Sequence, residues 1–136
     1  TIYLSQRVRE IVSIENNPAW YETVSEALKK QGLKNYIYSL IPNDTSSKKY
    51  YEIIREFPDD YFDLIVIDGV ERESCIHESV PKVKPGGIIM LDNSERQEYA
   101  MSIRKLGKWE RKDFYGPGPR NKYFWQTSIF KKPQPV

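Results

Sequence analysis

Short apolar runs that stop at acidic residues are the feature that most constrains the fold of this chain. The clearest lies in "FDLIVIDG" (62–69), where four consecutive apolar residues stand between Asp63 and Asp68. A strand that is apolar at every position is stable only when both faces of its sheet are covered. Because connecting helices cover both faces of a parallel sheet, this run predicts an α/β fold.

Strand-like and helical patterns alternate along most of the chain. Strand-like segments lie at residues 10–15, 35–41, 62–69 and 86–93, and each is followed by a helical pattern of apolar residues. Two further strand-like segments, 108–115 and 123–130, are joined by a short link rich in glycine and proline, which favours an antiparallel pair. The alternation predicts a three-layer α/β sandwich with a mostly parallel, Rossmann-like sheet and a C-terminal antiparallel strand pair.

Composition supports a single domain over residues 1–136. Hydrophobic residues make up 39% and charged residues 29% of the chain, which excludes a disordered protein. No apolar run approaches the roughly 18–20 residues of a membrane span. The single cysteine, Cys75, excludes an internal disulfide and fits a reducing compartment. We therefore expect a cytoplasmic protein that has no membrane partner.

Three of the predicted strands end on acidic residues, namely Glu15, Asp68 and Asp92. In parallel α/β sheets, ligands bind beyond the carboxyl ends of the strands, so these side chains mark a candidate site. Glu15 can accept hydrogen bonds from the two hydroxyls of a nucleotide ribose. It can equally favour the start of the following helix through the helix dipole.

Asp68 and Asp92 lie one strand–helix unit apart, and Asn93 follows directly. If the two strands are neighbours, these three side chains supply hard oxygen donors that suit Mg²⁺ or Ca²⁺. The two carboxylates can instead polarise or deprotonate a substrate hydroxyl. All three residues can also serve only to end strands and cap helices. The residues alone leave these alternatives open.

Several familiar site motifs are missing from the sequence. No glycine precedes Glu15, so no Gly-x-Gly-x-x-Gly loop lies before it. The chain also has no P-loop, no zinc spacing of Cys and His, and no Gly-x-Ser-x-Gly elbow. The single histidine, His77, is expected on the surface, and Cys75 in the core.

Several segments of the sequence resemble the class I S-adenosylmethionine-dependent methyltransferases, namely the closing strand pair and three earlier segments. They occur in the same order as in that family and extend over nearly the whole chain. The earlier segments are residues 12–28, 62–69 and 83–95. The resemblance implies a seven-stranded sheet whose seventh strand is antiparallel, and S-adenosylmethionine as the cofactor. It places Glu15 at the cofactor ribose, Asp44 near the adenine, and Asp68 beside the reactive methyl group. Asn16 is a further implied cofactor-binding residue.

The same resemblance aligns Asp68, Asp92 and Asn93 with the metal ligands of the catechol-type O-methyltransferases, which implies Mg²⁺. Glu71 departs from that subgroup, because a lysine base is expected at its position, and this departure counts against a metal-dependent mechanism. Asp68 and Asp92 are the implied catalytic residues, which position or deprotonate the methyl acceptor.

The family's first strand and glycine-rich loop would precede Thr1, so we expect an N-terminally truncated domain. The loss of a central strand leaves two long sheet edges. Either the family's second strand closes directly on its fourth, or a second copy of the chain fills the gap and makes a homo-oligomer, or the chain is a fragment of a longer protein. We favour the fragment.

We therefore predict a methyltransferase that moves a methyl group from S-adenosylmethionine to an oxygen or nitrogen of a small molecule. Nucleic acid is not expected as the acceptor, because the sequence lacks the Asn/Asp-Pro-Pro-aromatic signature of base-modifying relatives. One alternative is a non-catalytic interaction module that kept the fold without the cofactor loop and binds the cofactor weakly or not at all. A nicotinamide-dependent oxidoreductase is a second alternative, against which the closing antiparallel pair argues.

Overall fold

The computed structural model describes residues 1–42, 50–118 and 123–135. The chain divides into two compact units, Thr1–Tyr50 and Tyr51–Val136, and whether they form the expected single domain stays a prediction. The first unit holds helix α1 (Ile2–Ser5), strand β1 (Ile11–Glu15), helix α2 (Pro18–Lys30) and strand β2 (Tyr36–Leu40).

In the first unit, β1 and β2 pair in parallel, from Ile11 beside Tyr36 to Glu15 beside Leu40. Helix α2 connects the two strands and begins as its sequence predicts. The side chain of Asn17 accepts a hydrogen bond from the Trp20 backbone N–H at 3.1 Å, which satisfies one of the free N–H groups of the first turn. Leu28 of this helix is fully buried.

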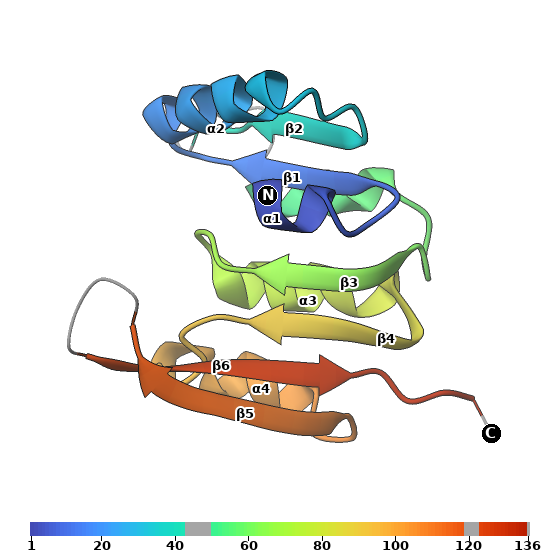
Figure 1. Ribbon diagram of the computed structural model, residues 1–136. Helices are drawn as coiled ribbons and strands as arrows, with labels where there is room; N and C mark the ends of the chain where they lie inside the picture. The colour runs from blue at the N-terminus through green and yellow to red at the C-terminus, as the bar shows by residue number, and fades with distance from the viewer. Residues whose placement is uncertain (43–49, 119–122, 136) are drawn as a thin grey trace. The chain divides into compact units, whose positions relative to one another are not determined.

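The second unit holds a mixed sheet in the strand order β3-β4-β6-β5 (Figure 1). A 3-10 helix η1 (Tyr50–Glu56) precedes it. The remaining elements are β3 (Phe62–Ile67), α3 (Arg72–Lys82), β4 (Val83–Leu91), the 3-10 helix η2 (Gln97–Tyr99), α4 (Ala100–Lys105), β5 (Glu110–Pro117) and β6 (Phe124–Lys131). Strands β3 and β4 are parallel, whereas β6 is antiparallel to both β4 and β5. The predicted α/β fold with an antiparallel C-terminal pair is confirmed.

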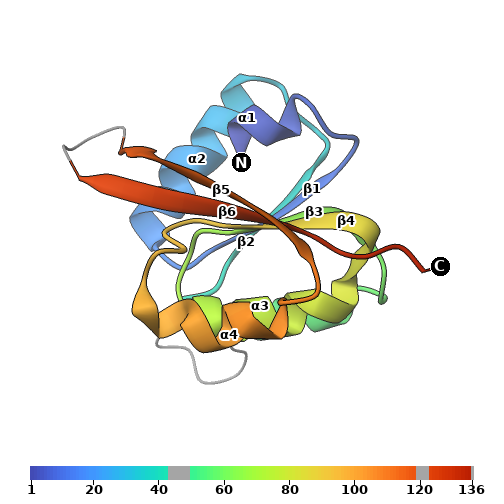
Figure 2. The same cartoon turned by 90° about the horizontal axis from the view of Figure 1, so that it is seen from below.

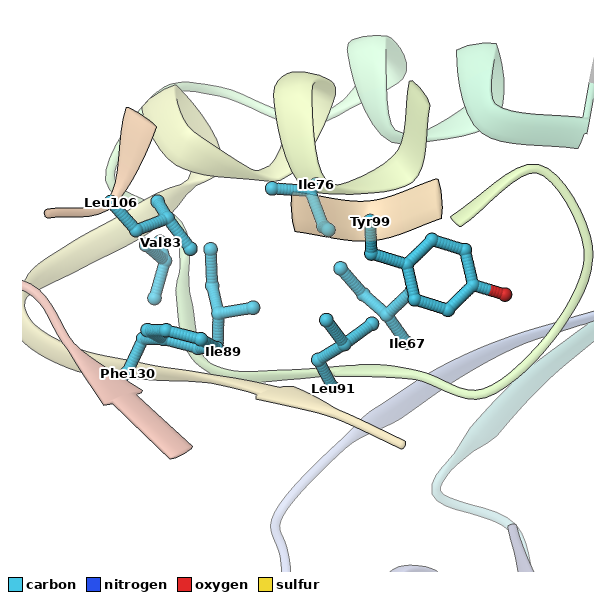
Figure 3. Packing of buried hydrophobic residues seen from close by; sticks show 8 residues of the cluster. All are labelled: Ile67, Ile76, Val83, Ile89, Leu91, Tyr99, Leu106 and Phe130. Carbon is cyan, nitrogen blue, oxygen red and sulfur yellow. The ribbon is translucent and has the colours of Figure 1, made fainter. Parts of the chain in front are cut away.

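Helices α3 and α4 lie on the same face of this sheet (Figure 2). Between helices and sheet lies one cluster of buried side chains (Figure 3), made of Ile67, Ile76, Val83, Ile89, Leu91, Tyr99, Leu106 and Phe130. Cys75 packs against this cluster as expected, and His77 is exposed as expected. The continuous apolar runs of β3 and β4 thus supply the core that supports the ends of both strands.

Gly86 and Gly87 precede the apolar run of β4, and glycine is needed at each for a different structural reason. Gly86 has a φ of +78°, a backbone conformation that favours glycine. At Gly87 a Cβ atom would lie 2.9 Å from the carbonyl oxygen of Lys84 and 3.0 Å from that of Asp63 in β3. Close approach of the two strand backbones therefore requires a residue without a side chain at this point.

Three predicted elements differ in detail. Strand β4 begins at Val83 rather than at residue 86 and ends before Asp92. The helical pattern that starts near Tyr50 forms a 3-10 helix, and the helix expected over 96–106 is a 3-10 turn followed by the six residues of α4. Whether the family's second strand closes directly on its fourth stays a prediction, since β1 and β3 belong to different units. None of the helices in the described ranges is long and apolar enough to cross a membrane.

Candidate functional site

Asp68 and Asp92 follow neighbouring strands at the same edge of the second sheet. The parallel pairing of β3 with β4 places Ile67 beside Leu91, the last residues of the two strands. The pairing continues one step further, because the Asp92 backbone N–H donates to the Ile67 carbonyl at 3.1 Å. The prediction that these two strand ends are neighbours is confirmed.

Arg72, the first residue of α3, lies between the two strand ends. Its guanidinium donates to the backbone carbonyls of Gly69 at 2.9 Å and Asp68 at 3.0 Å, and also to the Asp92 carbonyl. It further donates to Oδ1 of Asp68 and to Oδ1 of Asn93, both at 3.3 Å. One side chain therefore connects the segments that follow β3 and β4.

The two carboxylates are held to different degrees. Oδ1 of Asp92 accepts a hydrogen bond from the Thr127 hydroxyl of β6 at 2.8 Å, and its Oδ2 lies 3.9 Å from Nη1 of Arg72. The Asp68 side chain is 66% exposed and that of Asp92 36% exposed. Asp92 is thus a fixed charge, whereas Asp68 presents its carboxylate to solvent.

Partial burial raises the pKa of Asp68 above its usual range, and the neighbouring Asp92 carboxylate raises it further. The Arg72 guanidinium opposes this shift without cancelling it. Two carboxylates that share a single cation leave the group with a net negative charge.

The segment after Asp92 is attached to β6 through buried polar groups. The Ser94 backbone N–H donates to the Gln126 carbonyl at 2.8 Å, and the hydroxyls of Ser94 and Ser128 lie 2.6 Å apart. Asn93 has a φ of +52° and is only 4% exposed. These contacts hold the end of β4 in one conformation and turn the Asn93 amide inward.

The residues at this edge do not fit the predicted magnesium site. In the ranges that the structure describes, no group of three or more His, Cys, Asp and Glu side chains could hold a metal ion. The third oxygen expected there, Oδ1 of Asn93, accepts a hydrogen bond from Arg72 instead. A guanidinium, rather than an open set of oxygen donors, lies between the two acids.

In the first unit, Glu15 closes β1 and turns its carboxylate back onto the following turn. Its Oε1 accepts the backbone N–H groups of Asn16 and Asn17, both at 2.9 Å. No residue in the described part of the chain donates to Oε2, which is free to accept from a ligand. Nearby, partial burial raises the pKa of Tyr38 to about 12, and the Glu15 carboxylate contributes to the shift.

Three predicted site residues, Asp44, Glu15 and Asn16, are not placed beside Asp68 and Asp92. Asp44 lies outside the described residues. That Glu15 and Asn16 face the same site as Asp68 and Asp92 stays a prediction, since they belong to different units.

Sequence reasoning missed Arg72 and Thr127. A signal for Arg72 was present, because a cation at the first position of a helix opposes the helix dipole and therefore needs another reason to be there. Its spacing of four residues from Asp68 also matches the ion pair that the two side chains form. Thr127 gave no comparable signal, since its contact joins β6 to a residue 35 positions away.

No protein-family model and no curated protein sequence matches the chain significantly, whereas solved structures do match it. An rRNA methylase from Streptococcus thermophilus is 10% identical with a TM-score of 0.73, over 97% of this chain and 78% of that one. The O-methyltransferase TomG from Streptomyces achromogenes, solved with S-adenosylmethionine, is 12% identical with a TM-score of 0.73, over 97% and 67% of the two chains.

A third match is the precorrin 8W decarboxylase from Methanobacterium thermoautotrophicum, which is 23% identical with a TM-score of 0.63 over 96% of this chain and 73% of that one. At these identities the likeness concerns the fold. O-, N- and RNA methyltransferases occur together among the matched structures. The chain has the Rossmann-like fold of the class I S-adenosylmethionine-dependent methyltransferases.

Proposed function

We propose that this protein transfers a methyl group from S-adenosylmethionine to an oxygen or nitrogen of a small molecule. The observation that carries the proposal is the pair of acids at the ends of β3 and β4, connected by Arg72. In α/β sheets, this carboxyl edge is where ligands bind. The matched structures include proteins that carry out this class of reaction.

Glu15 has the chemistry of a ribose-binding residue. Its Oε1 is engaged by the turn that it precedes, which fixes the carboxylate in one orientation. The remaining oxygen can accept a hydrogen bond from a ribose hydroxyl. Bound S-adenosylmethionine supplies an electrophilic methyl group on a positively charged sulfur.

Asp68 is suited to act on the methyl acceptor. An acceptor hydroxyl or neutral amine can donate a hydrogen bond to its exposed carboxylate, which orients a lone pair towards the methyl carbon. Bound S-adenosylmethionine would supply the methyl group and would keep the electrons of the broken carbon–sulfur bond on its sulfur. The proton released by the acceptor passes to Asp68, while Asp92, held by Thr127, keeps its position.

The charge of this edge favours particular acceptors. Asp68 and Asp92 carry two negative charges against the single positive charge of Arg72. A neutral hydroxyl compound or a cationic amine is therefore attracted, whereas a phosphate-rich acceptor would meet exposed carboxylates. This supports a small-molecule acceptor over nucleic acid.

Calorimetric titration with S-adenosylhomocysteine tests the cofactor half of the proposal. Glu15→Gln keeps an oxygen for the turn but loses the charged acceptor, and the loss of one hydrogen bond to a charged group costs about 1.5–3 kcal/mol, or roughly 10- to 100-fold in affinity. The matched control is Glu22→Gln, an exposed acid on α2, which should leave the affinity unchanged.

Transfer of labelled methyl groups to a panel of phenols and amines tests the acceptor half. Asp68→Asn should abolish transfer while leaving the affinity for S-adenosylhomocysteine nearly unchanged, because its role lies with the acceptor. A protein that neither binds S-adenosylhomocysteine nor transfers methyl groups would overturn the proposal and favour the non-catalytic interaction module.

A further inference from the structure

Five oxygen atoms from the ends of two strands converge on the guanidinium of Arg72. Three are backbone carbonyl oxygens, from Asp68, Gly69 and Asp92. The other two are Oδ1 of Asp68 and Oδ1 of Asn93. These oxygens surround one planar cation, on its Nε, Nη1 and Nη2 atoms. Carbonyl, carboxylate and amide oxygens are the types of ligand that proteins otherwise offer to a hard divalent cation.

The surroundings of the guanidinium also resemble those of a bound ion. The Arg72 side chain is only 10% exposed, although arginine is rarely buried without a partner. Its guanidinium carbon lies 5.9 Å from the ring centroid of Tyr99, a member of the buried cluster. The charge is thus covered by an aromatic ring on one side and neutralised by carboxylates on the other.

The orientation of the Asn93 amide indicates that Arg72 determines how the oxygens around it are arranged. Its Oδ1 faces Arg72, while its Nδ2 is buried and has no hydrogen-bond partner among the described residues. A buried donor without a partner is destabilising. The amide therefore leaves one donor unsatisfied while it gives the cation an additional acceptor.

We propose that Arg72 is a built-in cation that takes the place of a divalent metal ion at the ends of β3 and β4. It neutralises part of the charge of Asp68 and Asp92 and holds the two segments in register, and so acts as a positioning residue. It does not touch the acceptor. The structural part of this inference stands on the contacts alone, whereas its catalytic consequence, methyl transfer without a metal, rests on the proposed function.

The inference predicts that removal of the guanidinium creates a metal site. In Arg72→Met the converging oxygens would remain without a cation, and Mg²⁺ can then bind among them. Mg²⁺ at ten times its dissociation constant would raise the folding equilibrium constant about 11-fold. The wild-type protein should show no such response, because its cation is already present.

Thermal unfolding and calorimetric titration with MgCl₂ test this prediction. The matched control is Arg55→Met, which removes an arginine from an exposed pair with Glu78 in the same unit. We expect Mg²⁺ to raise the unfolding temperature of Arg72→Met only. The double variant Arg72→Met/Asp92→Asn should lose most of this gain, because one of the charged ligands is gone.

If Arg72→Met does not fold by itself, Arg72→Lys serves as a second variant. Mg²⁺ should then restore its folded circular dichroism spectrum, whereas Arg72→Lys, which keeps a cation, should fold without Mg²⁺ and gain nothing from it. Failure of Mg²⁺ either to stabilise or to refold Arg72→Met would overturn the inference, as would an equal effect on the wild-type protein.

The catalytic consequence has a separate readout. Methyl transfer by the wild-type protein should be unchanged by EDTA, and Arg72→Lys should lower kcat more than it raises the KM for S-adenosylmethionine. Loss of wild-type activity on treatment with EDTA would overturn the metal-independent role. Absence of any transfer would count against the proposed function and would leave the Mg²⁺ results on Arg72→Met to decide the structural part.

Discussion

Leu91 connects the buried core to the candidate site, and its truncation tests whether this core supports the strand ends. Its side chain is fully buried in the cluster, and the next residue is Asp92 (Figure 3). Leu91→Ala removes three carbon atoms from this position while leaving the backbone pairing with Ile67 possible. The substitution therefore changes packing beneath the site without changing any polar group.

The cost can be worked out from burial. Three fully buried carbons contribute about 2.4 kcal/mol at ~0.8 kcal/mol each. The unfilled space adds to this loss, so that core Leu-to-Ala substitutions cost about 3–5 kcal/mol. The matched control is Val66→Ala on β3, whose side chain is 42% exposed. Two carbons that are little more than half covered contribute about 0.9 kcal/mol.

Urea unfolding followed by tryptophan fluorescence gives both free energies, since Trp109 packs against the buried cluster. We expect Leu91→Ala to lower the free energy of unfolding at least three times as much as Val66→Ala. The rate of methyl transfer should also fall in Leu91→Ala, because Asp92 loses the support beneath it. A cost below about 1 kcal/mol, or one equal to that of Val66→Ala, would refute the packing argument.

Two further predictions concern ionisable side chains. Burial raises the pKa of Cys75 to about 12, so at pH 8 a thiol reagent should label it only as fast as the protein unfolds, and labelling of the native protein within seconds would contradict this. Because partial burial and the Asp92 carboxylate raise the pKa of Asp68, the folded protein binds that proton more tightly than the unfolded chain does, and the charged carboxylate costs stability at neutral pH. Asp68→Asn should therefore raise the free energy of unfolding near pH 7, with a gain that shrinks as the pH falls through the raised pKa and is lost below about 4. Urea unfolding across this range checks the prediction, and a gain of the opposite sign would contradict it.

The elements that could be predicted from the sequence are those with local causes. Asn17 and Pro18 mark the start of α2 through interactions within one turn. The run Leu64 to Ile67 predicts a strand because every residue in it is apolar, although Val66 is 42% exposed in the structure. Those signals were sufficient for the fold and for the pairing of the two strand ends.

The arrangement of the candidate site depended on contacts that no local pattern encodes. Arg72 reaches Asn93, 21 residues away, and Thr127 reaches Asp92, 35 residues away. The start of β4 was misplaced for a similar reason. Its pairing with β3 extends to Val83 beside Phe62 across an irregular register, which the sequence Lys-Pro-Gly-Gly does not suggest.

The sequence separation of these contacts bears on two interpretations of Asp68 and Asp92, which follow β3 and β4. The acids either only end the strands or belong to a functional site. A residue that only ends a strand or caps a helix makes its hydrogen bonds within a few positions of itself. Asp92 instead binds the hydroxyl of Thr127 from β6, and neither it nor Asp68 caps α3, whose N-cap residue is Glu71 and forms no side-chain cap. Asp68 leaves its carboxylate exposed and carries a raised pKa, which is unfavourable for stability and typical of functional groups. Local turn chemistry therefore does not account for Asp92, and its contact with β6 supports the proposed site at the carboxyl edge of the sheet.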